Sequence, residues 1–76
     1  MKRKLFLEKL YDELEIESIN QLTVDTILHD LDEWDSLTLL SLISFIENEF
    51  SINLSAEEIE KFVKLKDLTD RLKLNE

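Results

Sequence analysis

The chain has 76 residues, no cysteine, and 18 acidic against 9 basic side chains, which gives a formal net charge of −9. A chain this short buries only about 60% of its unfolded surface, which argues against the large cleft of an enzyme. The charge disfavours nucleic acid and anionic membranes and favours partners with basic surfaces, while the lack of cysteine excludes a disulfide framework and a thiolate zinc site.

The N-terminal segment predicts a helix from Lys4 to about Glu15. Apolar residues recur there at helical spacing. They are Phe6, Leu7, Leu10, Tyr11 and Leu14. Glu8 and Lys9 interrupt the apolar run too early for a signal peptide, and no stretch is long enough to span a bilayer. We therefore expect a single domain over residues 1–76, monomeric and cytoplasmic.

The charges of this first helix oppose its dipole. Lys2, Arg3 and Lys4 lie at the positive end of the dipole, and Glu13 and Glu15 lie at the negative end. Tertiary packing, rather than capping, must therefore stabilise this helix. The basic triplet is interpreted as a solvated start, with a nucleic-acid or membrane contact as the minor alternative.

Residues 16–35 form a long connection that carries its own apolar anchors. A structureless loop of this length is unusual in a compact domain. The anchors are Ile19, Leu22, Val24, Ile27, Leu28, Leu31 and Trp34. The segment TVDTILHDL predicts one helical turn near the middle of the loop, and His29 is expected to be solvated.

Four acidic residues at the end of this loop raise the question of calcium. They are Asp30, Asp32, Glu33 and Asp35. An EF-hand fails, because the chain has no glycine for the turn and no Glu lies twelve positions into a loop begun at Asp30. We expect weak screening by divalent cations and no metal site.

Residues 33–50, EWDSLTLLSLISFIENEF, predict the central helix. Asp35 is the expected N-cap, because its carboxylate can accept from the free amides of the first turn, and Ser36 is then the first helical residue. A helical wheel gathers one core face. It consists of Leu39, Leu42, Ile43, Ile46 and Phe50, with Leu40 at its margin. The wheel places Leu37 on the opposite side, in water.

Two shorter helices complete the fold. Ser55 and Glu58 match the S-x-x-E capping box, which predicts a helix from Ala56 to about Lys61. The apolar pattern then continues into a last helix over residues 66–73. The predicted fold class is all-α, a small bundle of three main helices and one short helix with a long first loop.

The order of these elements resembles the acyl carrier protein family, including its peptidyl and alanyl relatives. D-S-L alone is three common residues, but here Asp35-Ser36-Leu37 is followed in register by apolar and acidic positions, and the likeness covers nearly the whole chain. The positions in register are Leu40, Leu42, Ile43, Ile46, Glu47, Glu49 and Phe50.

The resemblance implies that Ser36 carries 4′-phosphopantetheine, attached from coenzyme A, and that Asp35 and Leu37 flank the attachment point. The arm would hold an acyl or aminoacyl group as a thioester. The implied partners are a phosphopantetheinyl transferase, an acyl- or aminoacyl-loading ligase and acyltransferase-type enzymes with basic docking surfaces. No catalytic residue is expected, since nothing in the sequence places His29 beside Ser36 as a base.

The residues expected to dock partners each have a plainer interpretation. Leu37 is predicted to be a docking contact, although single exposed leucines are common on protein surfaces. Glu47 and Glu49 fit partner steering and an ordinary solvated face equally well. Ser36 itself could be an ordinary first-turn residue of an Asp-capped helix. The apolar and acidic positions that follow it in register with the family are what favour modification.

The attachment motif departs from carriers of primary fatty acid synthesis, which usually resemble G-A-D-S-L-D. Here Glu33 and Trp34 precede Asp35, and Thr38 follows the motif. E-W-D-S-L is more similar to discrete carriers of specialised pathways, which handle polyketide, aminoacyl or cell-envelope acyl groups. Bulky side chains can also fill the space that long-chain carriers open between helices, which favours a short or polar cargo. They are Leu39, Ile43, Ile46, Ile59 and Phe62.

Two alternatives stay open at this stage. One is a carrier of primary fatty acid synthesis. The other belongs to a different class, an acidic helical module that binds a basic protein and never carries a prosthetic group.

Overall fold

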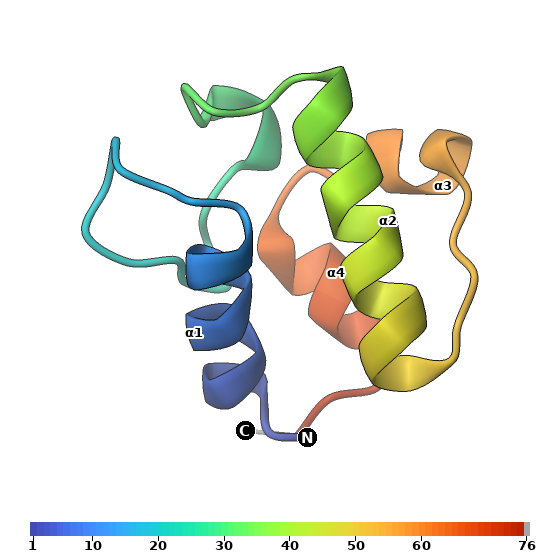
Figure 1. Ribbon diagram of the computed structural model, residues 1–76. Helices are drawn as coiled ribbons and strands as arrows, with labels where there is room; N and C mark the ends of the chain where they lie inside the picture. Colours follow the sequence, from blue (N-terminus) through green and yellow to red (C-terminus); the bar gives the residue numbers. More distant parts are fainter. Residues whose placement is uncertain (76) are drawn as a thin grey trace.

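The computed structural model describes residues 1–75, in which the secondary-structure elements are helices joined by loops (Figure 1). It contains α1 (Arg3–Glu13), the 3-10 turn η1 (Leu28–Asp30), α2 (Ser36–Phe50), α3 (Ala56–Glu60) and α4 (Leu65–Arg71). The prediction of three main helices, one short helix and a long first loop is confirmed. The two ends of the described chain lie side by side, because the backbone N–H of Arg3 donates to the carbonyl of Asn75.

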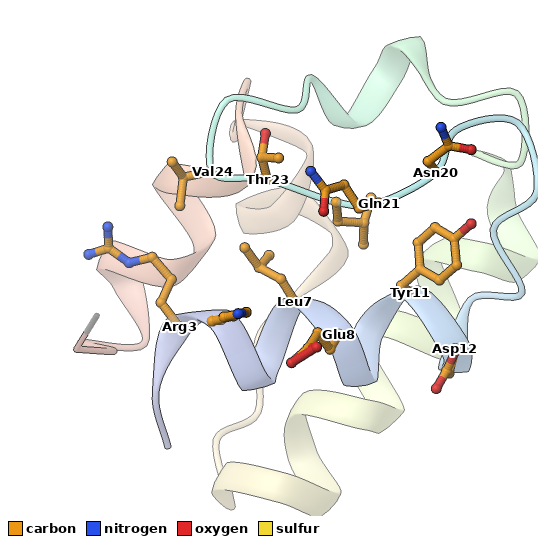
Figure 2. Close-up of a pocket in the computed structure, with 11 residues that line it drawn as sticks. Arg3, Leu7, Glu8, Tyr11, Asp12, Asn20, Gln21, Thr23 and Val24 are labelled. Carbon is orange, nitrogen blue, oxygen red and sulfur yellow. The ribbon is translucent and has the colours of Figure 1, made fainter.

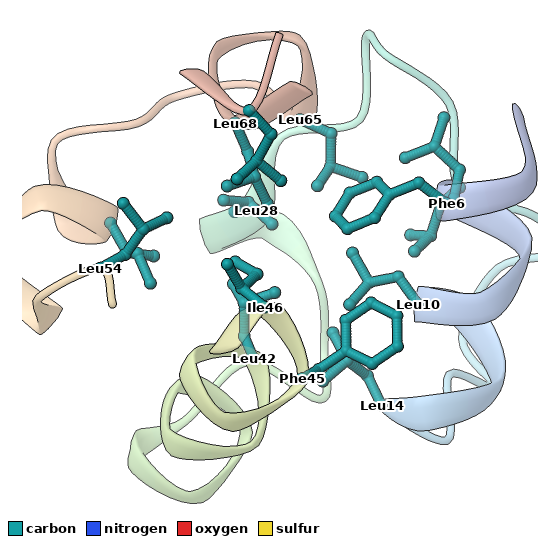
Figure 3. Close-up of a cluster of buried hydrophobic side chains, with 14 of the residues drawn as sticks. Phe6, Leu10, Leu14, Leu28, Leu42, Phe45, Ile46, Leu54, Leu65 and Leu68 are labelled. Carbon is teal, nitrogen blue, oxygen red and sulfur yellow. The ribbon is translucent and has the colours of Figure 1, made fainter. Parts of the chain in front are cut away.

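One apolar cluster joins the helices (Figure 3). Its fully buried members come from α1, η1, α2, the α2–α3 connection, α3 and α4. They are Phe6, Leu10, Leu28, Leu42, Ile46, Leu54, Ile59, Leu65 and Leu68. Burying a side chain of this size contributes about 1.5–3 kcal/mol, so this cluster is the main source of stability.

Packing holds α1, as its charge pattern predicted. Its N-cap residue Lys2 makes no side-chain capping hydrogen bond. The ring of Phe6 instead lies 5.8 Å from that of Phe45 and 5.6 Å from that of Phe50, both on α2. At the surface of the same interface, Lys9 Nζ lies 3.5 Å from Glu49 Oε1.

The long loop is anchored as predicted, with one exception. Leu22, Leu28 and Leu31 are buried, and the other predicted anchors except Ile27 pack against the core in partly buried positions. Ile27 is 37% exposed. Its backbone pairs with Lys64 in an isolated antiparallel bridge, so the chain at this position is held through the main chain.

Several local expectations need correction. Phe45 is a buried member of the α2 core face that the sequence interpretation omitted. Leu39, Ile43 and Phe50 are only partly buried. The predicted cap of α3, by contrast, is confirmed, because Ser55 Oγ accepts from the Glu58 N–H at 3.1 Å.

The carboxylate of Glu58 has a tertiary partner. Its Oε2 accepts from Arg71 Nε on α4 at 2.6 Å. The S-x-x-E motif therefore marked the start of α3 correctly, while its second half serves a contact between α3 and α4.

The chain reaches three left-handed backbone positions without glycine. They are Glu15, Ser51 and Lys73, with φ of 52°, 56° and 57°. Ser51 is the C-cap residue of α2, where such a conformation ends the helix and its N–H donates to the carbonyl of Glu47.

Candidate functional site

Ser36 occupies the first position of α2, at the end of the long loop (Figure 1). Its side chain is exposed, and within residues 1–75 its hydroxyl has no hydrogen-bond partner. The neighbouring Asp35 is extended and caps the helix, since its Oδ1 accepts from the Thr38 N–H at 2.8 Å. This capping bond lowers the pKa of Asp35 below its ordinary value, so the carboxylate stays ionised beside the serine. The predicted cap and the predicted first helical residue are both confirmed.

An exposed apolar strip lies next to the serine. Leu37 is 74% exposed, as the helical wheel predicted, and Leu40, one turn further along α2, is 58% exposed. The sequence had placed Leu40 at the margin of the core face. Two exposed leucines in adjacent turns form a larger apolar contact than the single leucine the sequence indicated.

Glu33 binds two distant residues just before the serine. Its Oε2 accepts from the backbone N–H groups of Glu17 and Ser18, each at 2.9 Å, and its Oε1 accepts from Ser18 Oγ at 2.7 Å. These bonds, led by the one from the Glu17 N–H, lower the pKa of Glu33 from 4.5 to about 2. The sequence interpretation considered Glu33 only as a calcium ligand and as a departure from G-A-D-S-L, and it missed this role.

A shallow pocket of about 460 Å³ opens between this segment and the end of α1. Four carboxylates and one exposed leucine are among the side chains that line it. The lining residues are Glu13, Leu14, Glu15, Glu33, Asp35, Leu37, Thr38 and Ser41. The surface beside Ser36 is therefore acidic with an apolar edge, which suits a basic partner.

The serine has no base of its own. His29 is exposed, and its ring lies edge-on to that of Trp34 at 5.6 Å. No hydrogen bond within residues 1–75 joins His29 to Ser36. Among the same residues no group of three or more His, Cys, Asp or Glu side chains is arranged to hold a metal ion. An enzyme that modified Ser36 would have to supply the activating groups itself.

The other predicted docking residues lie further away. Glu47 is exposed on α2, eleven residues after Ser36, which is roughly 16 Å along a helix axis. Glu49 is in the same turn but faces α1, where it pairs with Lys9. The structure thus brings Asp35 and Leu37 together at the serine and leaves the two glutamates at the far end of the helix.

A larger groove of about 800 Å³ lies elsewhere, between α1 and residues 20–24 (Figure 2). Leu7 and Tyr11 line it from α1, and Leu22 and Val24 line it from the loop. Ser36 is not among the residues that line it.

Comparison with known proteins agrees with this geometry. A family model described as "Phosphopantetheine attachment site" matches residues 4–72. An acyl carrier protein of Syntrophus aciditrophicus (strain SB) is 31% identical over 68 residues, which cover 90% of this chain and 84% of that protein. The chain belongs to the acyl carrier protein family. No solved structure matches it significantly.

As a member of the acyl carrier protein family, the chain is a carrier and no enzyme, and its cofactor is 4′-phosphopantetheine. The residues present fit this group. The exposed Ser36 hydroxyl has no partner within residues 1–75 and lies at the capped N-terminus of α2, which leaves room for a covalent arm. The adjoining pocket is open to solvent.

Within residues 1–75 there is no helix with the length and apolar character needed to cross a bilayer.

Proposed function

We propose that Ser36 is the residue that carries 4′-phosphopantetheine. The single observation that supports it best is the position of the Ser36 hydroxyl, which is exposed and unpartnered at the first residue of α2. Six serines are present in the chain. Only Ser36 combines a helix start, a preceding capping acid and a following leucine in solvent.

The modification is a transfer from coenzyme A. Ser36 Oγ forms a new bond to the phosphorus that bears the pantetheine, the diphosphate bond of coenzyme A breaks, and the nucleotide part leaves with that bond's electrons. The hydroxyl proton passes to a base of the transferase, because the Asp35 carboxylate caps α2 and no side chain within residues 1–75 hydrogen-bonds the Ser36 hydroxyl. Once bound, the arm supplies a thiol that holds the cargo as a thioester. The chain contributes a rigid helix end that presents the hydroxyl in one direction.

Docking is the second task of the same surface. We assign the apolar contact to Leu37, the adjacent charge to Asp35, and longer-range attraction of basic partners to Glu47 and Glu49. The partners are a phosphopantetheinyl transferase, a loading ligase and acyltransferase-type enzymes with basic docking surfaces. Opposite charges on carrier and partner raise the association rate more than the affinity, so the carrier can leave each partner after delivery.

The cargo is proposed to be a short or polar acyl or aminoacyl group of a specialised or cell-envelope pathway. The support is the packing of the core, where Ile46 and Ile59 are fully buried and Phe62 packs against the same cluster in a partly buried position. A long-chain carrier of primary fatty acid synthesis remains the competing carrier function, with the E-W-D-S-L motif against it. Loading with acyl groups of increasing length, followed by thermal melting, tests this, because a chain that entered the core should raise the melting temperature.

Intact-mass analysis tests the site. After incubation with coenzyme A, magnesium and a broad-specificity phosphopantetheinyl transferase, the parent should gain the mass of one arm. Ser36→Ala should stay folded and gain none, because the Asp35 cap remains and Ala is a good helix former. Ser41→Ala and Ser44→Ala are the matched controls on the same helix, and both should be modified. A parent that is never modified would favour the acidic interaction module instead.

A further inference from the structure

The residues around Ser36 form a small ring closed by hydrogen bonds. Thr38 Oγ1 donates to the carbonyl of Glu33 at 2.6 Å, and the Thr38 N–H donates to Asp35 Oδ1 at 2.8 Å. Ser36 lies within both closures. Because residues 36–38 also belong to α2, the orientation of the hydroxyl depends on α2 and on how the rest of the ring, residues 33–38, is fastened to the molecule.

The Glu33 carboxylate makes that fastening. It accepts the hydrogen bonds from the Glu17 and Ser18 N–H groups and from the Ser18 hydroxyl, across 15 to 16 residues of sequence. We call these three bonds the Glu33 clamp. Within residues 1–75, they are the side-chain hydrogen bonds that join the ring to a distant part of the chain.

The ring is also held by α2, to which residues 36–38 belong, by backbone hydrogen bonds to neighbouring residues, and by an apolar contact. Trp34 packs against the core in a partly buried position. Apolar contact holds a segment close but has little directional preference, whereas three hydrogen bonds to one carboxylate define both distance and direction. The clamp thus supplies what the tryptophan does not, a defined orientation of the ring relative to residues 17 and 18 at the start of the long loop.

We propose that Glu33 is a positioning residue for modification of Ser36, holding residues 33–38 so that the hydroxyl meets the transferase in a single orientation. This inference rests on the proposed function of Ser36. It assigns Glu33 a geometric task, distinct from the attraction of basic partners by surface acids. An error of about 1 Å in the placement of a reacting group can cost on the order of 100-fold in rate, so a loosened ring should slow the transfer step.

Steady-state kinetics of the transferase reaction test this, with the carrier as the varied substrate. Glu33→Ala removes the clamp and should lower kcat by tenfold or more with a smaller change in KM. Glu33→Gln should stay within about threefold of the parent, since its amide oxygen can accept both N–H groups and its NH₂ can donate to Ser18 Oγ. Glu13→Ala is the matched control, because it removes one charge from the same pocket without breaking a hydrogen bond within residues 1–75.

Three kinetic results would overturn the proposal. They are a kcat for Glu33→Ala equal to that of Glu13→Ala, an effect confined to KM, and a loss in Glu33→Gln as large as in Glu33→Ala. The last two would assign Glu33 to charge attraction. A parent that is not modified at Ser36 would instead count against the proposed function, so the two failures are distinguishable.

Amide hydrogen exchange supplies a readout independent of catalysis. In Glu33→Ala, the amides of Glu17, Ser18 and Thr38 should exchange faster, while that of the core residue Leu68 should not change. Equal acceleration throughout would indicate general destabilisation and contradict a positioning role. If Glu33→Ala does not fold, Ser18→Ala decides the matter, since it removes one of the three bonds. Ser18→Ala should lower kcat less than tenfold, and an unchanged kcat would overturn the proposal.

Discussion

Truncating Leu37 separates a docking contact from a core contact. This residue is 74% exposed, so only about a quarter of its surface is covered. Full burial of a leucine contributes about 1.5–3 kcal/mol, so Leu37→Ala should lower the free energy of unfolding by less than about 1 kcal/mol. The buried Ile46, two to three turns along the same helix, provides the contrast, because Ile46→Ala should cost about 2–5 kcal/mol.

The loss at Ile46 must be read against total stability. A chain of this length has about 4–11 kcal/mol to lose, so Ile46→Ala can leave a large unfolded fraction. Ile46→Val, expected to cost about 0.5–1.5 kcal/mol, is the milder variant that keeps the measurement in range. Urea unfolding followed by circular dichroism and by Trp34 fluorescence gives these free energies, and agreement between the two signals checks two-state behaviour.

The effects of these substitutions on modification by the transferase should follow the opposite order to their effects on stability. Leu37→Ala should raise the KM of the transferase for the carrier several-fold, whereas folded Ile46→Val should be modified like the parent. Equal stability losses at Leu37 and Ile46 would refute the packing argument. Normal kinetics in Leu37→Ala would remove the docking role while leaving the packing argument intact.

Two further predictions concern charge. The pKa of Glu33 is lower in the folded chain than in the unfolded chain, so its contribution to stability is complete above pH 4.5 and is lost as the pH falls toward about 2. Urea midpoints measured over this range should therefore fall less steeply for Glu33→Gln than for the parent, and parallel curves would contradict the hydrogen-bond assignment. Repulsion at a net charge of −9 opposes folding, so moderate salt or millimolar magnesium should raise the melting temperature. Monovalent salt at matched ionic strength should recover much of the gain from magnesium, and a lower melting temperature in magnesium would show the reasoning to be wrong.

Features that depend on near neighbours in sequence were predictable. Helical spacing of apolar residues identified the helices, and the short side chains of Asp35 and Ser55 marked the starts of α2 and α3, because a cap bonds an amide only three residues away. The exposure of Leu37 followed from its angle on the same helix. The candidate attachment residue was therefore visible in the sequence, along with the local geometry that presents it.

Features that depend on residues distant in sequence were decided by the tertiary structure. The Glu33 carboxylate meets the amides of Glu17 and Ser18 only because the end of the long loop folds back on its beginning, and no periodicity encodes that approach. For the same reason Glu58 bonds to Arg71, thirteen residues away. A local capping box would instead have paired the Glu58 carboxylate with the backbone N–H of Ser55. The sequence thus determined which residue is presented at the head of α2. The fold determined what orients it, because loop closure brings together groups whose sequence separation carries no signal of their contact.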